Sequence, residues 1–130
     1  MEEEIFARGL ENRKKVLGAD HVERSWSNAN AFNREIQEFI TRYAWGEVWN
    51  RPGLPHKTRS MLNIAMLGAM GHEHELKLHV QGALRNGVSE LEIKEILLQV
   101  AVYAGAPASL RAFRIASEAI ESYRPPEISE

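Results

Sequence analysis

Residues 88–105 read VSELEIKEILLQVAVYAG and carry the clearest helix pattern of the chain. Ser89, followed three positions later by Glu92, is the capping-box pattern with which a helix begins. Apolar residues then recur at helical spacing, at Ile93, Ile96, Leu97 and Val100. The segment therefore predicts a helix that begins at Ser89.

The same periodicity continues on both sides of this segment and predicts helices along nearly the whole chain. Helices are expected from the N-terminus to a stop at Gly18, over residues 30–45, from His56 to Gly71, from Glu73 to Asn86, and from Pro107 onward. Pro52 and Gly53 break the periodicity before His56. No linker, repeat or low-complexity stretch appears. We expect an all-α single domain, residues 1–130, folded as a bundle of about six helices.

The composition is that of an ordinary globular protein and argues against two classes of partner. The chain has 130 residues, of which 44% are hydrophobic and 26% charged. Its net charge of −2 comes from mixed acidic and basic residues, without the basic stripe that nucleic-acid binding requires. The apolar runs are too short for a membrane span, and the acidic start MEEE differs from a secretory signal. We expect a cytoplasmic protein that binds neither nucleic acid nor membrane.

Residues 71–79, GHEHELKLH, contain three histidines and raise the question of a metal site. His74 and His79 are five positions apart, which separates them by about 140° around a helix. His72 and His79 share a face but lie roughly 10 Å apart along the axis, too far to bind one ion. We therefore predict no metal site and no metal cofactor here.

His79 is a better candidate for acid–base chemistry. It lies at the edge of the apolar stripe, beside Leu76 and Ala83. Glu75 lies one turn earlier, where a carboxylate can orient the imidazole and raise its pKa. The alternative is a half-buried histidine with a purely structural role.

A second candidate segment is YAWGEVWNRPG, residues 43–53, which surrounds the stretch from Gly46 onward where the helical periodicity breaks and where we expect no helix. It concentrates Trp45, Glu47, Trp49 and Arg51, and binding groups are commonly placed on irregular segments of a helical scaffold. The alternative is that both tryptophans fill the core while Glu47 and Arg51 pair on the surface.

These segments together carry a family resemblance. The stretches VLGADHV (16–22), TRYAWGEVWNRPGL (41–54) and residues 58–108, TRSMLNIAMLGAMGHEHELKLHVQGALRNGVSELEIKEILLQVAVYAGAPA, resemble the carboxymuconolactone decarboxylase family. The resemblance extends over about residues 8–119 and implies the alkylhydroperoxidase D-like helical fold. That wider superfamily is known for a Cys-x-x-Cys-x-x-x-His signature. In this register His79 is kept, while His72 and Glu75 occupy the cysteine positions.

The missing thiols limit what the resemblance implies. The chain has no cysteine, so thiol peroxidase activity is excluded by chemistry. The proton-relay glutamate of the superfamily falls at or next to Ser60 in this register. A catalytic carboxylate must then come from elsewhere, and Glu47 is the natural candidate.

The resemblance implies cofactor-free decarboxylation of 4-carboxymuconolactone to 3-oxoadipate enol-lactone, in the protocatechuate branch of the β-ketoadipate pathway of aromatic catabolism. Such a lyase needs cations for a dianionic lactone and an acid for carbon protonation. Arg51 is the first choice for binding a carboxylate, because arginine offers a bidentate fork, and Arg59 and Arg85 are weaker choices. His79, with a pKa expected near neutral, suits proton donation, and Trp45 and Trp49 suit apolar walls.

Two other functions stay open. The chain could be a related lyase or isomerase acting on another small carboxylated ring, or a non-catalytic helical oligomerisation module. A homo-oligomer is expected in each case, and the resemblance implies a hexamer. The sequence supports an oligomer independently. Two predicted helices are apolar around most of their circumference, namely SMLNIAMLGAM (60–70) and IKEILLQVAVYAGA (93–106). A single small bundle cannot cover that much apolar surface.

Overall fold

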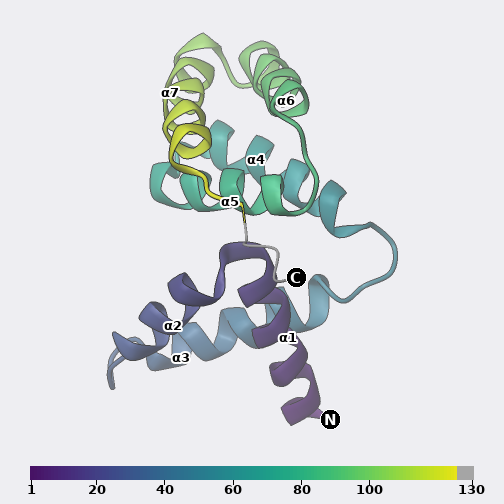
Figure 1. Ribbon diagram of the computed structural model, residues 1–130, viewed down its shortest axis with the longest axis vertical. Helices are drawn as coiled ribbons and strands as arrows, with labels where there is room; N and C mark the ends of the chain where they lie inside the picture. Colours follow the sequence, from purple (N-terminus) through teal and green to yellow (C-terminus); the bar gives the residue numbers. More distant parts are fainter. Residues whose placement is uncertain (126–130) are drawn as a thin grey trace. The chain divides into compact units, whose positions relative to one another are not determined.

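The computed structural model describes residues 1–125, and this part of the chain contains helices and no strands (Figure 1). The elements are α1 (Glu2–Leu17), α2 (Ala19–Ser27), α3 (Arg34–Phe39), the π-helix η1 (Ile40–Val48), α4 (His56–Met70), α5 (Glu73–Arg85), α6 (Glu90–Tyr103) and α7 (Ala106–Ser122). The predicted all-α class is confirmed, with more helices than the expected six. Among the described residues, no helix has both the length and the apolar character needed to cross a membrane.

The chain divides into two compact units, residues 1–56 and the residues from Lys57 onward. The first unit contains α1 to η1, and the second contains nearly all of α4 together with α5, α6 and α7. The expected single domain, residues 1–130, stays a prediction.

The first unit is organised by close packing of α1 against η1. Two glycines make this approach possible: a Cβ on Gly9 would collide with the carbonyl oxygen of Thr41, and one on Gly46 would lie 2.6 Å from the carbonyl oxygen of Ile5. Any larger residue at either position would force the two helices apart. Glycine therefore sets the distance between the backbones of α1 and η1.

The helix predicted over residues 30–45 is replaced by the short α3 and the π-helix η1, which continues to Val48. The hydroxyl of Thr41 donates to the carbonyl of Gln37 at 2.7 Å, a local bond that competes with the regular helical ladder. The prediction that Glu47 lies in a non-helical segment was wrong, because it belongs to η1. Single stretches of π-helix often occur at functional sites.

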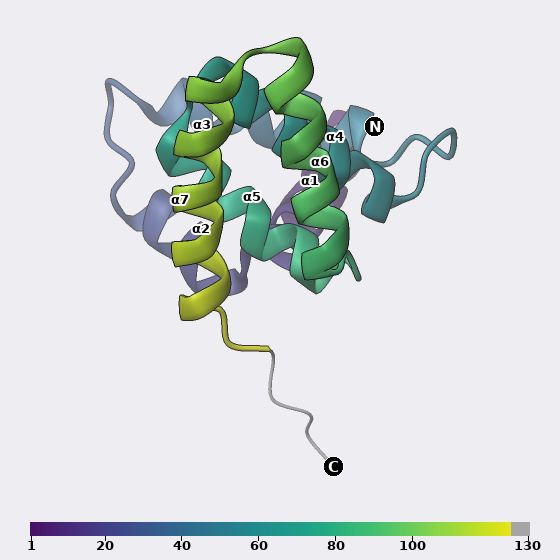
Figure 2. The same ribbon diagram turned by 90° about the horizontal axis from the view of Figure 1, so that it is seen from above.

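The second unit packs α7 against both α5 and α6, and Figure 2 shows α6 and α7 side by side. Its core consists of buried aliphatic side chains from all four helices and from the turn between α5 and α6, namely Ile64, Leu76, Val80, Ala83, Val88, Ile93, Leu97, Ala112, Ile115, Ala116 and Ala119. The hydroxyl of Ser109 donates to the carbonyl of Leu97 at 2.7 Å and ties α7 to α6. The helix α5, which carries His79, contributes Leu76, Val80 and Ala83 to this core.

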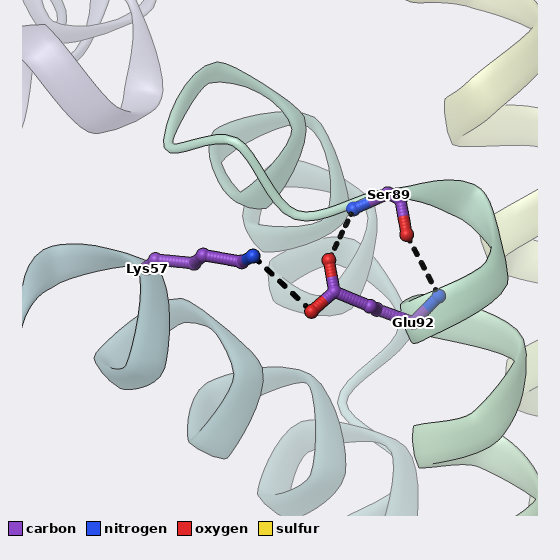
Figure 3. A network of polar contacts seen from close by, with 3 residues as sticks. All are labelled: Lys57, Ser89 and Glu92. Atoms are coloured by element: carbon purple, nitrogen blue, oxygen red, sulfur yellow. Dashed lines mark hydrogen bonds and ion pairs between the residues drawn. The ribbon is translucent and has the colours of Figure 1, made fainter.

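The predicted capping box at the start of α6 is confirmed (Figure 3). The amide of Glu92 donates to the Ser89 hydroxyl at 3.0 Å, and the amide of Ser89 donates to a Glu92 carboxylate oxygen at 3.0 Å. The second carboxylate oxygen lies 3.2 Å from the Lys57 ammonium, which joins the start of α4 to the start of α6. The bond from the Ser89 amide, followed by Lys57, lowers the pKa of Glu92.

Candidate active site

His79 lies in α5 and is half-buried, with Leu76 and Ala83 buried on either side of it along the helix. The amide nitrogen of Asn63, on α4, lies 3.5 Å from Nδ1 of the imidazole. The structure therefore places His79 at the edge of the apolar core, as its spacing predicts, and adds a polar neighbour from a second helix.

The expectation of a near-neutral pKa for His79 was wrong. Burial lowers its pKa to about 4, and the nearby carboxylate of Glu75 opposes this shift without cancelling it. Glu75 acts in the predicted direction. However, the free energy lost by removing the imidazolium from water exceeds the stabilisation that one exposed carboxylate provides. The imidazole is consequently uncharged at neutral pH in the ligand-free protein.

Sequence reasoning missed Asn63, and it interpreted Ser60 only as the position of a lost glutamate. Ser60 is fully buried and its hydroxyl accepts a hydrogen bond from the side chain of Asn86 at 2.9 Å. The signal for both residues lay in α4, where Ser60 and Asn63 are polar positions within the apolar run 60–70. A polar residue in such a run usually has a specific partner.

Trp45 and Trp49 form a stacked pair in the first unit. Each is 5% exposed, and their rings lie 4.7 Å apart at 23°. The ring of His56 meets Trp49 edge-on, with centroids 5.2 Å apart and planes at 75°. Both tryptophans therefore fill the core of their unit, as the alternative to a binding role predicted. Their role as walls of a substrate pocket stays a prediction.

Glu47 and Arg51 are exposed on the first unit. Glu47 lies within η1, and Arg51 follows it, with its amide donating to the carbonyl of Val48 at 3.1 Å. His79 belongs to the second unit. The convergence of Glu47, Arg51 and His79 on one pocket stays a prediction.

The two weaker arginine candidates both belong to the second unit. Arg59 is half-buried in the first turns of α4. Arg85, half-buried at the end of α5, places its guanidinium 5.7 Å from the ring centroid of Tyr123. This cation–π geometry gives Arg85 a structural partner within its own unit. The choice of Arg51 as the first substrate-binding residue stays a prediction.

The described residues contain no group of three or more histidine, aspartate or glutamate side chains placed to hold a metal ion. In α5, His72 is the N-cap residue and is exposed, as is His74. The chemistry that the described side chains offer is proton transfer at His79 and ionic binding at the arginines.

The chain is thus a small all-α protein with a half-buried histidine on α5. It also has a stacked tryptophan pair, followed two positions later by the exposed Arg51. The chain belongs to the carboxymuconolactone decarboxylase family, whose model matches residues 34–118. It is 50% identical to a 4-carboxymuconolactone decarboxylase of Acinetobacter baylyi over 117 residues, which are 90% of this chain and 87% of that protein. It is also 45% identical to the nitrosuccinic acid decarboxylase npaB of Metarhizium robertsii over 116 residues, 89% of this chain and 81% of the other.

Proposed function

We propose that the chain is a carboxy-lyase that converts 4-carboxymuconolactone to 3-oxoadipate enol-lactone without a cofactor. The observation that carries this proposal is the 50% identity, over 90% of the chain, to a protein of that name. In this proposal the enzyme acts in the protocatechuate branch of the β-ketoadipate pathway. Its expected location is the cytoplasm.

The reaction needs no metal or organic electron sink. When the ring carboxylate leaves as CO2, the electron pair of the broken bond moves through the ring double bond to the lactone carbonyl. The resulting dienolate resembles an oxyfuran and is stabilised by its own conjugation. A proton then adds to the carbon alpha to the carbonyl, which restores the lactone. The protein supplies cations, an oxyanion donor and an acid.

Three side chains carry these tasks in the proposal. Arg51 binds a substrate carboxylate through its bidentate fork, His79 transfers the proton, and Glu47 is the carboxylate that accompanies them. Trp45 and Trp49 provide an apolar wall that favours the departure of neutral CO2. Arg59 and Arg85 are secondary binding groups.

The low pKa of His79 fits this role through the charge of the substrate. Burial keeps the free imidazole neutral at pH 7. A dianion bound beside it favours the charged form and raises its pKa, so that the proton is taken up with the substrate. The acid is then present in the complex and absent from the empty site.

Replacing Arg51 tests the binding half of the proposal. Arg51→Lys keeps the charge and removes the fork, so we expect KM to rise about tenfold with kcat little changed. Steady-state kinetics with 4-carboxymuconolactone measures both constants. An unchanged KM would remove Arg51 from the site.

The chemistry itself is tested by following loss of the lactone spectrophotometrically with and without EDTA. We expect the same turnover in both conditions, since the proposal uses no metal. Loss of activity after chelation, restored by one added divalent ion, would contradict a metal-free mechanism. Absence of any turnover would favour the non-catalytic oligomerisation module.

A second candidate function is decarboxylation of another small polycarboxylate. It is favoured by the 45% identity to a protein named nitrosuccinic acid decarboxylase. A lyase or isomerase acting on a different carboxylated ring belongs to the same group of alternatives. A panel that compares kcat/KM for the lactone, nitrosuccinate and related ring acids separates these functions.

The active form in the proposal is a homo-oligomer, with a hexamer favoured by the family resemblance, and the two units of each chain act as one domain. Large apolar side chains exposed on the second unit support association: Leu62, Met66, Met70, Leu91, Leu98, Val102, Tyr103 and Leu110. Exposed apolar area of this kind usually marks an interaction surface.

A further inference from the structure

The segment between Trp49 and His56 is closed by one histidine. Nε2 of His56 lies 2.8 Å from the carbonyl oxygen of Trp49, and the two rings meet edge-on. A carbonyl oxygen only accepts hydrogen bonds, so Nε2 must carry the hydrogen and donate it. His56 therefore holds Trp49 through both its backbone and its ring, from the opposite end of the loop formed by residues 50–55.

The N-terminal end of this loop is anchored by two asparagines. The side-chain nitrogen of Asn50 donates to the carbonyl of Gly46 at 2.7 Å. The side-chain nitrogen of Asn12, on α1, lies 2.7 Å from the side-chain oxygen of Asn50 and 2.9 Å from the carbonyl of Trp45. These bonds satisfy carbonyls that the end of a helix leaves open. The start of the loop is thus fixed to the α1–η1 core.

The middle of the loop is exposed, and the amide of Arg51 there donates to the carbonyl of Val48 at 3.1 Å. Residues 51–55 are all exposed. Pro52 and Pro55 fix their own φ angles but supply no backbone N–H donor. His56 therefore secures the C-terminal end of the exposed loop that contains Arg51.

We propose that His56 is a positioning residue for Arg51. By holding Trp49, it keeps residues 50–55 in one conformation and so presents the Arg51 guanidinium in a fixed orientation to a substrate carboxylate. The inference rests on the proposed function, in which Arg51 binds that carboxylate. A bidentate ion pair gains from such preorganisation because less conformational freedom is lost on binding.

Two substitutions test the hydrogen bond and the ring contact of His56 one at a time. His56→Phe keeps an aromatic edge against Trp49 but removes the donor, whereas His56→Gln keeps an amide donor and removes the ring. His74→Phe, at an exposed position of α5, is the matched control. Each variant is characterised by kcat and KM for 4-carboxymuconolactone and by near-ultraviolet circular dichroism, which reports the stacked tryptophans.

We expect His56→Phe to raise KM about five- to tenfold, the effect of one lost hydrogen bond, with kcat within about twofold of wild type. The KM of His56→Gln should lie much closer to the wild-type value than that of His56→Phe. His74→Phe should match wild type in kcat, KM and dichroism. The tryptophan dichroism should weaken in His56→Phe. An unchanged KM in His56→Phe would overturn the proposal, even if the dichroism changes.

The decisive comparison places His56→Phe in the Arg51→Lys background. If His56 acts through Arg51, the second substitution should add less than about twofold to the KM of Arg51→Lys. A full additional increase would overturn the positioning role while leaving the role of Arg51 intact. A wild-type KM in Arg51→Lys alone would instead overturn the role of Arg51 in the proposed function. If His56→Phe does not fold, His56→Asn replaces it in the same double-substitution experiment. The asparagine amide is too short to reach the Trp49 carbonyl, so this variant also lacks the hydrogen bond.

Discussion

At the scale of single residues, His79 carries the proposed chemistry. His79→Ala removes the proton donor, and we expect kcat to fall by about 10²–10⁴-fold with little change in fold. Helical circular dichroism checks the fold, and single-turnover decay of the lactone measures the chemical step. His74→Ala, in the same helix and exposed, should keep wild-type turnover. Wild-type turnover in His79→Ala would end the assignment.

The same residue makes stability depend on pH. Burial lowers the pKa of His79 from its ordinary value of 6.5 to about 4. Between these two values the unfolded chain binds a proton that the folded chain does not, so the free energy of unfolding falls as the pH is lowered from 6.5 towards 4. Urea unfolding at several pH values should show this loss in the wild type and a shallower loss in His79→Gln. Parallel curves for the two proteins would contradict the shifted pKa.

The site shows what a single sequence can predict about a residue. The position of His79 at an apolar edge follows from its spacing to Leu76 and Ala83 in one helix. Its pKa does not, because burial is produced by the packing of the whole second unit. Asn63 is sixteen positions away on another helix, and periodicity within one helix gives no access to such a contact.

At the scale of elements, the predictions succeeded where local chemistry determines the structure. Ser89 and Glu92 form the capping box, and Pro107 lies at the start of α7. The sequence pattern does not reveal α2, because Gly18, with φ of 94°, both ends α1 and precedes α2, and a glycine at that position indicates only the end of a helix. The π-helix η1 was not predicted, because the periodicity analysis assumes the 3.6-residue turn of an α-helix and a π-helix has a wider turn.

The contact between α1 and η1 supplies a prediction at this scale. Gly46→Ala places a methyl group 2.6 Å from the carbonyl oxygen of Ile5, so the helices must separate. We expect a loss of about 1–3 kcal/mol in the free energy of unfolding, the usual cost of overpacking. Gly53→Ala is the control, because a Cβ there meets nothing within 4 Å. Equal stability of the two variants would show that α1 and η1 do not pack this closely.

At the scale of the whole molecule, the second unit carries apolar surface that its own four helices leave uncovered. Val102 and Tyr103, at the end of α6, are 77% and 83% exposed, and Leu110, in α7, is 71% exposed. The first two lie on a helix whose apolar residues extend around most of its circumference, so packing one face against α7 leaves others bare. Water contact with this surface is unfavourable by about 25 cal/mol per Å² of apolar area that association would remove.

This surface predicts self-association. Light scattering at micromolar concentration should give a mass several times that of the 14.8 kDa chain. Val102→Glu, which introduces a charge at an exposed apolar position of this surface, should shift the population towards smaller species, because burying an unpaired carboxylate is costly. Ser117→Glu, at an exposed polar position of α7, should leave the mass unchanged. A wild-type protein that scatters as a single chain would contradict the oligomer, and the apolar residues of α6 and α7 would then need a different partner.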